Sequence, residues 1–381
     1  MNNKLYNNIS FPNSKNENWR YFNLQELKIK LDKIKNSKSI LSIFNNYDIE
    51  SHLKIDDKGI FINKNLPQGI TIDIINNKDL KLLDEKIKKN IGKIASVDND
   101  YFVSENNQIF NELVIIKVKE NTNIKSDLKL DINISKNIKF IPRFFIYAEK
   151  ESRSSIEINW DSNFCSINSV FEVYLKNKAQ LDFVITNNGQ NSIDIFNYSF
   201  QLEKESNLKT TFISLGNQIV KNDIRINLID KKAHADIGGL YIAKSNSTID
   251  YNIKMNHLSK ETSSKQIFKG ILNENSKVSF TGLVKIEKDC VDCKSEQINN
   301  NLLLSEKAQI NSDPQLEIYC NDVECSHGST VGQFDDDILF YIRSRGIPEK
   351  YAKKMLLEAF YMDILNRVNN PKTKSVIENS I

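Results

Sequence analysis

A cysteine and a histidine two residues apart are the side chains in this sequence best suited to metal chemistry. Cys325 and His327 lie in the run CSHG, in a chain with five cysteines and four histidines. If residues 316–328 form a strand, its two-residue period places both side chains on one face, close enough to share an ion. Thiolate and imidazole suit iron and zinc, and two donors leave positions open for a partner's ligands or a transient cluster. The alternative is that Cys325 packs in the core and His327 bonds to a backbone carbonyl.

The remaining candidate ligands are isolated. Cys290 and Cys293 form one C-x-x-C pair between two predicted strands, without the second pair of a zinc site or the helix start of a thioredoxin-like motif. We interpret them as loop thiols. The other histidines have no neighbouring donor and are expected to serve the fold: His52, His234 and His257. The acids at 335–337 suit the first turn of a helix, which explains them without a metal.

Several well-known catalytic and nucleotide-binding motifs are absent. The sequence contains no G-x-x-x-x-G-K-[ST] or G-x-G-x-x-G loop, no G-x-S-x-G elbow and no H-E-x-x-H helix. Lys and Arg number 52 against 49 Asp and Glu, a net charge of +3 that is spread along the chain. Nucleic-acid binding needs a concentrated cationic face, so we do not expect it. The sequence therefore does not indicate hydrolase chemistry, and any nucleotide hydrolysis would fall to another subunit.

The N-terminus and the cysteines indicate the compartment. The first 19 residues lack the apolar region of a signal peptide, and no stretch approaches the ~18 apolar residues that span a bilayer. An odd number of cysteines without a secretion signal argues against a disulfide framework. We therefore expect a cytoplasmic protein with free thiols and no membrane association.

Short runs of alternating apolar residues predict a mainly β fold across residues 111–332. A small and an apolar residue, two positions apart, recur after polar corners, starting at positions 179, 206, 233, 276 and 308. The intervals of 27, 27, 43 and 32 residues suggest stacked coils, so we predict a parallel β-helix. A two-sheet sandwich is the alternative, because the intervals are irregular.

Helical patterns flank this core. Residues 23–38 and 80–94 have amphipathic helical spacing and residues 60–75 alternate like a strand, which predicts an α+β unit over 1–95. The β-helix core is assigned to 96–333 and a C-terminal helical domain to 334–381, with a first helix at roughly 335–345. A second helix is expected to have Pro348 at N1 and to place these residues on one face: Ala352, Met355, Leu356, Ala359, Met362, Leu365 and Val368.

Two segments near the ends of the chain and two segments between them resemble a known family. The run SDPQLEIYCNDVECSHGSTVGQFDDDILFYIRSRGIP, residues 312–348, is similar to the hallmark of the SufB/SufD family of iron–sulfur cluster assembly proteins. The run FPNSKNENWRYFNL, residues 11–24, resembles the family's entry motif, and HLSKETSSKQIFKGIL and QINNNLLLSEKAQI resemble stretches between them. Residues 298–301 lack the cysteine of the SufB branch, so the likeness is to the SufD branch.

The resemblance implies a right-handed parallel β-helix that pairs with a SufB subunit. It also implies that the SufC ATPase docks on the C-terminal helices and alone hydrolyses ATP. His327 matches the family's histidine near the SufB interface, which implies a transient iron or iron–sulfur cluster ligand, with Cys325 as a second donor. The residues expected to bind a partner are Phe340, Arg343, Met355, Leu356 and Ala359.

Beyond the transient iron or cluster, the resemblance assigns no stable cofactor, and it leaves open a flavin and a homodimer formed without SufB. Cys290 and Cys293 fall where the family more often has no cysteine, so no function is transferred to them.

Two other functions compete with this assignment. A carbohydrate-active β-helix enzyme would display a pair of acid/base carboxylates on its coils, and no such pair is evident in the sequence. A purely structural β solenoid would assemble with itself and would not bind a SufC-like ATPase. An assay on polymeric glycans and a pull-down with such an ATPase distinguish these alternatives.

Overall fold

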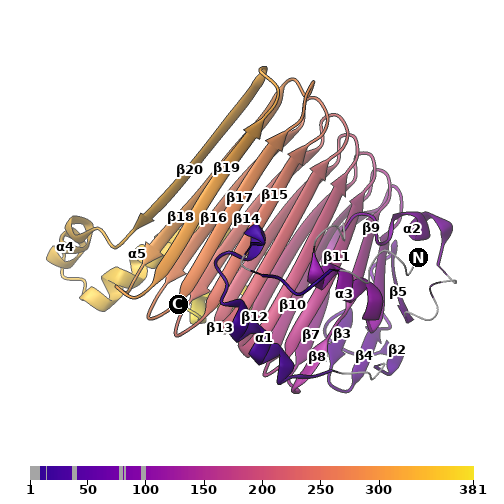
Figure 1. Ribbon diagram of the computed structural model, residues 1–381, viewed down its shortest axis with the longest axis horizontal. Helices are drawn as coiled ribbons and strands as arrows, with labels where there is room; N and C mark the ends of the chain where they lie inside the picture. Colours follow the sequence, from indigo (N-terminus) through magenta and orange to yellow (C-terminus); the bar gives the residue numbers. More distant parts are fainter. Residues whose placement is uncertain (1–8, 14, 37–40, 77–79, 81–82, 96–99) are drawn as a thin grey trace.

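The chain forms a parallel β-solenoid of about seven turns, which confirms the predicted fold class (Figure 1). The computed structural model describes residues 9–13, 15–36, 41–76, 80, 83–95 and 100–381. The first strands are β1 (Lys35–Asn36), β2 (Ile43–Tyr47), β3 (Leu53–Asp56), β4 (Gly59–Asn63), β5 (Ile70–Asn76), β6 (Glu112–Val118), β7 (Asn123–Ile134), β8 (Ile138–Phe140) and β9 (Arg143–Ala148). The others are β10 (Arg153–Asn163), β11 (Ser166–Leu175), β12 (Gln180–Leu202), β13 (Asn207–Leu228), β14 (His234–Ala243), β15 (Thr248–His257), β16 (Ser263–Leu272), β17 (Lys277–Ile286), β18 (Cys293–Leu303), β19 (Gln309–Ile318) and β20 (Val323–Gly332).

Successive segments of the core alternate between two stacks of parallel strands. Stack A contains β7, β10, the first parts of β12 and β13, then β14, β16, β18 and β20. Stack B contains β9, β11, the second parts of β12 and β13, then β15, β17 and β19. Because each strand pairs in parallel with the equivalent strand of the next coil, the sandwich alternative is wrong.

The corners between the stacks explain the irregular intervals in the sequence. Ala179, Ser206 and Ala233 are buried just before segments of stack A, whereas Ser276 and Ala308 are buried just before strands of stack B. The interval of 43 residues therefore joins two different corner series. Within each series the small residues recur at close to one coil length.

The interior of the solenoid changes from apolar to polar along its length. In the early coils Phe144, Phe171 and Tyr198 stack, with ring-centroid distances of 4.4 and 4.9 Å. In the later coils Gln266 and Gln297 are fully buried, and their side-chain amides have no hydrogen-bond partner among the described residues. A buried polar group without a partner costs roughly 1–3 kcal/mol, so the polar interior stabilises the last coils less than the aromatic interior stabilises the first.

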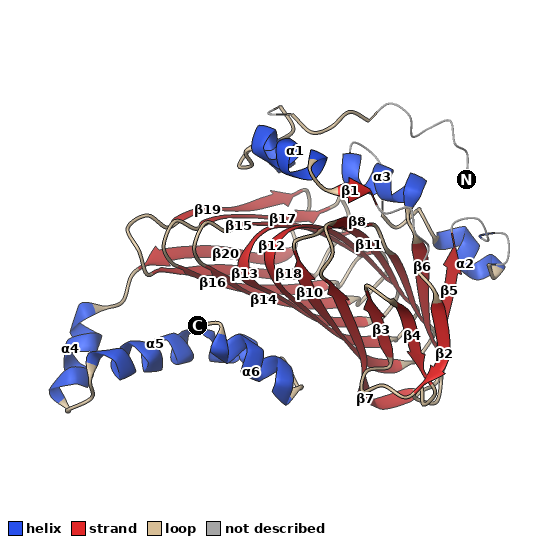
Figure 2. Cartoon of the chain, turned by 90° about the horizontal axis from the view of Figure 1, so that it is seen from below, coloured by secondary structure: helices blue, strands red, loops and turns tan. Residues whose placement is uncertain are grey.

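Helices cover the outer faces of both stacks (Figure 2). The described helices are η1 (Glu17–Trp19), α1 (Leu24–Asp32), α2 (Glu85–Asn90), α3 (Tyr101–Ile109), α4 (Asp336–Ser344), α5 (Glu349–Leu365) and α6 (Pro371–Asn379). On stack B, Trp19 and Phe102 pack with Ile195 of β12. On stack A, the end of α5 and α6 bury five apolar residues: Tyr361, Ile364, Leu365, Val368 and Ile377. The N-terminal elements η1 and α3 and the C-terminal helices α5 and α6 therefore lie on opposite faces of the solenoid.

The N-terminal elements are shorter than the sequence predicts. Helix α1 begins after Asn23, whose side chain accepts a hydrogen bond from the Glu26 amide at 3.2 Å, and it ends at Asp32 rather than 38. Residues 37–38 lie outside the described residues. Of the predicted helix 80–94 only Glu85–Asn90 is helical, and 81–82 also lie outside the description.

The predicted strand 60–75 is two strands, β4 and β5. Helix α3 lies inside the range 96–333 that was assigned to the β-helix. Strand β3 pairs in parallel with β7, so the N-terminal region continues the same sheet. The three domain ranges stay predictions.

The predicted first C-terminal helix is confirmed as α4. The Asp335 side chain accepts hydrogen bonds from the amides of Asp337 and Ile338 at 3.0 and 3.1 Å, and Gly346 follows the helix with a φ of +87°. Pro348, however, is the N-cap of α5 rather than its N1 residue, because its ψ of 144° is extended. The third helix, α6, was not predicted.

The prediction of one continuous apolar face on α5 is wrong. Met355, Ala359 and Met362 are exposed, whereas Tyr361 and Ile364 are buried. The cause is that the first half of α5 lies beside α4 and projects from the solenoid, while the second half packs on stack A (Figure 2). The two halves therefore bury different faces.

Candidate functional site

Strand β20 forms the C-terminal edge of stack A and carries both predicted metal donors. It pairs only with β18 among the described strands, with Ser295 opposite Cys325 and Gln297 opposite His327. The predicted strand 316–328 is interrupted, because β19 ends at Ile318 and the chain turns a corner before β20 begins at Val323. Cys325 and His327 nevertheless lie on one strand and on its inward-facing side, in a last coil that no further coil covers.

The His327 side chain is exposed at this edge. The ring has no hydrogen bond to any residue that the structure describes, so the alternative in which it bonds to a carbonyl is not what the structure shows. Directly beneath it, in register, lies the buried and unpartnered amide of Gln297. Gly282 of the opposite stack makes room for that amide, since a Cβ at this glycine would lie 1.6 Å from Gln297 Nε2. The imidazole therefore faces solvent above a polar interior.

Cys325 is half-buried and packs against the main hydrophobic core. Burial raises the pKa of its thiol, the charge of Cys293 adds to the effect, and a backbone hydrogen bond with Ser295 opposes it. The thiol is thus protonated at neutral pH in the chain alone. A metal that binds this sulfur must displace the proton.

Three of the other four cysteines lie near the same corner of the solenoid, whereas Cys165 is buried just before β11 in an early coil. Cys290 and Cys293 are buried, Cys320 is half-buried, and all are free thiols. Cys293 is the first residue of β18 rather than a loop residue, and its sulfur donates a hydrogen bond to the Ser259 carbonyl at 3.3 Å. Among the described residues, no group of three or more histidine, cysteine or acidic side chains is arranged to hold a metal.

Sequence spacing did not reveal this proximity of cysteines. Cys293 and Cys325 are 32 residues apart, close to one coil, and Cys293 pairs with Val323 of β20. The length of one coil is the sequence signal that could have revealed this proximity, because residues one coil apart lie on neighbouring strands.

The isolated histidines serve the fold, as predicted. His257 is fully buried, with its two ring nitrogens 2.8 Å from Thr262 Oγ1 and 2.9 Å from Ser264 Oγ. Burial lowers its pKa to about 4, so it is neutral. His52 Nδ1 accepts a hydrogen bond from the Lys129 amide at 3.0 Å. His234 Nδ1 lies 2.7 Å from Ser263 Oγ.

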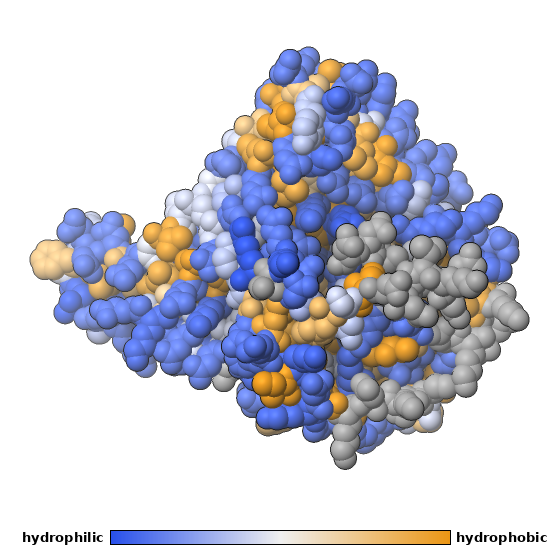
Figure 3. Space-filling model, viewed as in Figure 1, coloured by the Kyte–Doolittle hydropathy of each residue, from blue (hydrophilic) through white to orange (hydrophobic). Residues whose placement is uncertain are grey.

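The arm formed by α4 and the first half of α5 carries four of the five residues expected to bind a partner. Phe340 is 72% exposed and Met355 is 48% exposed. Arg343 is exposed and lies 3.4 Å from Glu349, Ala359 is exposed, and Leu356 is half-buried. Figure 3 shows apolar patches on this projecting arm. The structure adds three exposed side chains that the sequence did not single out: Ile338, Tyr341 and Tyr351.

A largely buried guanidinium holds the base of the arm on the solenoid. Arg367, just after α5, donates to both carboxylate oxygens of Asp236 at 2.9 and 3.0 Å and to Thr211 Oγ1 at 3.0 Å. A Cβ at Gly238 would lie 2.6 Å from Arg367 Nε, so a glycine is required for this approach. The Asn370 amide donates to the buried Glu157 carboxylate at 2.9 Å. The base of the arm is therefore fixed, while α4 projects.

Comparison with known proteins gives one family. Residues 132–360 match the model of the SUF system FeS cluster assembly, SufBD core domain. An iron–sulfur cluster assembly SufBD family protein of Synechocystis is 26% identical, with 96% of this chain and 85% of the relative covered. SufD of Escherichia coli is 31% identical over 43% of this chain and 38% of the relative.

A SufBD family protein of Mycobacterium tuberculosis is 27% identical over 48% of each chain. The match thus spans less than half the length of the Escherichia and Mycobacterium relatives. None of the helices in the described ranges combines the length and the apolarity that a membrane span requires.

Proposed function

The chain belongs to the SufB/SufD family of iron–sulfur cluster assembly proteins, and from this premise we propose that it is a SufD-like scaffold subunit. In this role it pairs with a SufB subunit, binds a SufC ATPase and does not itself hydrolyse ATP. The observation that carries the proposal is the exposed His327 imidazole at the edge strand β20. The family match also favours assembly over the carbohydrate-active and self-assembling alternatives.

The open edge supports pairing with a second solenoid. An edge strand such as β20 presents backbone donors and acceptors on its free side, and another strand can pair with them and extend the sheet. A SufB subunit placed there would bring its own ligands next to Cys325 and His327. Two donors from this chain and two from the partner would complete the four ligands that an iron or cluster site commonly uses.

The two donors have different proposed roles. The His327 side chain is exposed and its ring has no hydrogen bond to the described residues, so it binds iron or the nascent cluster directly. Cys325 is half-buried with a raised pKa, so its thiolate forms only as metal displaces the proton. Iron and sulfide are substrates of this assembly, and the proposed cluster is transient. The proposed function requires neither a flavin nor a homodimer formed in the absence of SufB.

The projecting arm supports docking of the ATPase. Large apolar side chains on α4 and α5 remain exposed although the base of the arm is fixed to stack A. Exposed apolar patches of this kind commonly mark protein interfaces. Arg343 adds a cation beside this patch, and it would contact an acidic group of SufC.

The cysteines support a reducing compartment, because all five are free thiols. We propose that this compartment is the cytoplasm.

The decisive experiment is to co-express the chain with SufB and SufC partners and to measure iron and acid-labile sulfide in the purified complex. His327→Ala should abolish cluster content while leaving subunit stoichiometry unchanged. The matched control is Glu324→Gln, on the same strand but 75% exposed and paired with Lys294. Normal iron and sulfide in the His327→Ala complex would refute the ligand role.

A second measurement tests docking of the ATPase. Phe340→Ser should weaken capture of SufC at least about tenfold, as loss of a central aromatic contact does. Phe164→Ser, at a corner of the solenoid where the ring is 60% exposed, is the control for loss of an exposed phenylalanine. Equal capture of SufC by both variants would show that α4 is not part of the interface.

A further inference from the structure

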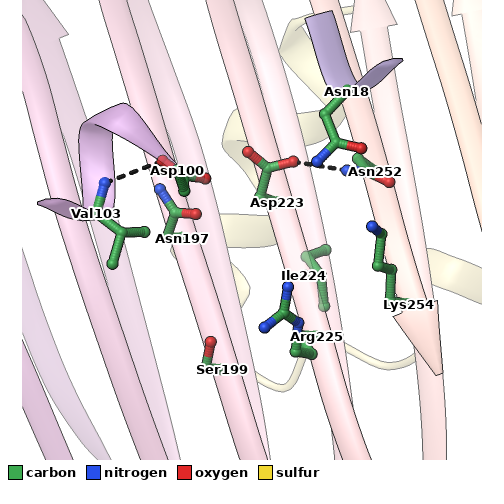
Figure 4. A pocket seen from close by; sticks show the side chains of 10 residues that line it. All are labelled: Asn18, Asp100, Val103, Asn197, Ser199, Asp223, Ile224, Arg225, Asn252 and Lys254. Atoms are coloured by element: carbon green, nitrogen blue, oxygen red, sulfur yellow. Dashed lines mark hydrogen bonds between the residues drawn. The ribbon is translucent and has the colours of Figure 1, made fainter. Parts of the chain in front are cut away.

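A polar cavity lies on the outer face of stack B, beneath the N-terminal segment, and the proposed assembly function does not use it. Its volume is about 260 Å³. It is bounded by Asn18 in η1 and by Asp100 at the start of α3 (Figure 4). Cavities for drug-sized ligands are commonly ~300–1,000 Å³, so this one suits a smaller molecule.

The register of three strands builds the floor of this cavity. Asn197, Asp223 and Asn252 lie side by side across β12, β13 and β15. Two residues further along the same strands, a second row holds Ser199, Arg225 and Lys254. All six side chains point outward, because the residues between them belong to the hydrophobic core. Polar groups in two rows on a rigid sheet form a built site rather than a loop surface.

The carboxylate of Asp223 is already satisfied. Lys221, which is fully buried, lies 3.1 Å from Asp223 Oδ1 and 2.6 Å from Asp250 Oδ2. Asn252 Nδ2 donates to the same Asp223 oxygen at 3.0 Å. Asp223 therefore forms part of the floor of the cavity, and the other charged groups of the cavity can bind a ligand.

Charges of both signs in the cavity have no ion-pair partner among the described residues. Arg225 and Lys254 contact no carboxylate, and Asp100 contacts no cation but accepts a hydrogen bond from the Val103 amide at 3.0 Å. Around the cavity three cations face three anions, so the formal charge sums to zero: Lys221, Arg225 and Lys254 against Asp100, Asp223 and Asp250. A ligand that satisfies the unpaired groups must carry one charge of each sign.

A buried amide independently points to ligand binding at this site. Asn197 is only 6% exposed and its Nδ2 has no hydrogen-bond partner among the described residues. In Figure 4 this amide lies between Asp100 and the row that contains Arg225. Native proteins rarely leave a buried donor unsatisfied, because it loses its hydrogen bond to water.

We propose that this cavity binds a small zwitterion, an α-amino acid, with its ammonium group toward Asp100 and its carboxylate toward Arg225 and Lys254. The unpaired Asn197 amide donates to the carboxylate. A simple anion would leave Asp100 unpaired, and a simple cation would leave both basic groups unpaired. Burial, and secondly the charge of Asp223, raise the pKa of Asp100 to about 6, and a bound ammonium group would lower it.

The test is calorimetric titration of the isolated full chain with a panel of L-amino acids. At least one should bind, and its amide and its deaminated acid, which each lack one charge, should bind at least about tenfold more weakly. Arg225→Gln and Asp100→Asn should each weaken binding to a similar degree. Asparagine also caps helices, so Asp100→Asn preserves the start of α3.

Control variants distinguish loss of the binding site from loss of the folded structure. Asn227→Ala, two residues beyond Arg225 on β13, should leave binding unchanged. If Arg225→Gln does not fold, as thermal unfolding would show, Lys254→Gln replaces it. Binding of inorganic phosphate without binding of any amino acid would overturn the proposal. So would the lack of any binding up to about 10 mM, or unaltered affinity in the variants.

Discussion

Arg20 and Asp313, 293 residues apart in sequence, form an ion pair that joins the N-terminal segment to the last coil of the solenoid. Arg20 belongs to the segment 11–24 and Asp313 to the segment 312–348, the two stretches that carried the family resemblance. The same N-terminal segment is held by the buried Lys221, whose ammonium donates to the Asn18 carbonyl at 2.9 Å. The N-terminal segment therefore crosses stack B and contacts the coil that carries His327.

Replacing Arg20 should loosen the last coil without unfolding the chain. Both partners are about one-third exposed, so Arg20→Ala should cost no more than about 1 kcal/mol of global stability. Amide hydrogen exchange in β19 should nevertheless become faster, because the edge coil has few other attachments. The control is Lys30→Ala, whose ion pair with Glu26 lies within one helix. Unchanged exchange in β19 would show that Arg20 does not restrain this coil.

The reactivity of Cys325 should rise with pH well into the alkaline range. Burial raises its pKa above the ordinary value of 9, and only the thiolate is alkylated. In the isolated chain, iodoacetamide labelling followed by peptide mass spectrometry should give a Cys325 rate that still increases above pH 9. A rate that is already constant at pH 7 would mean that the thiolate is stabilised, contrary to the structure.

The repeating features of the fold were predictable from the sequence, because they depend on local periods. The alternation of apolar residues and the small residues at corners, such as Ala179 and Ser206, indicate parallel coils since each coil repeats the same burial pattern. The caps of α4 were predictable for the same reason, as Asp335 and Gly346 act through their own turns. Helix α5 itself was predicted, but its buried face was not, because its burial depends on where the solenoid ends.

The candidate site was predictable only in part. Cys325 and His327 were found by spacing on one strand, and the structure confirms that they share a face. The amide of Gln297 beneath His327 and the approach of Cys293 to β20 depend on the pairing of successive coils. Sequence periods that vary between 27 and 32 residues do not fix that register. Contacts between coils therefore had to come from the structure.

Removing the guanidinium of Arg367 should release the C-terminal helices from stack A. Arg367→Ala leaves Asp236 without its partner in a mostly buried position, at a cost of about 2 kcal/mol or more. Limited proteolysis should then cleave within residues 349–379 faster than in the unaltered chain. Arg367→Lys keeps the charge but loses the paired hydrogen bonds, so its effect should be smaller. Arg343→Ala, on the projecting arm, is the control and should not change cleavage.

The buried His257 should make the solenoid less stable in mild acid. Its pKa is lowered by burial from 6.5 to about 4, so the folded chain resists protonation while the unfolded chain accepts a proton below pH 6.5. Stability from this group is complete above pH 6.5 and falls as the pH drops toward 4. The total loss is about 3 kcal/mol, since each unit of pKa difference corresponds to about 1.4 kcal/mol.

Comparing His257→Gln with the unaltered chain isolates this contribution. Asp194 and Glu112 are buried carboxyls whose pKa values are raised to about 7, and they act in the opposite direction, losing stability as the pH rises between about 4 and 7. Both chains contain these two groups, so their effect cancels in the difference. Urea unfolding at pH 7.5 and pH 4.5 should show a smaller acid destabilisation for His257→Gln, because glutamine does not titrate. An equal loss in both chains would mean that His257 is already protonated in the fold, which its contacts with two hydroxyl groups and no carboxylate oppose.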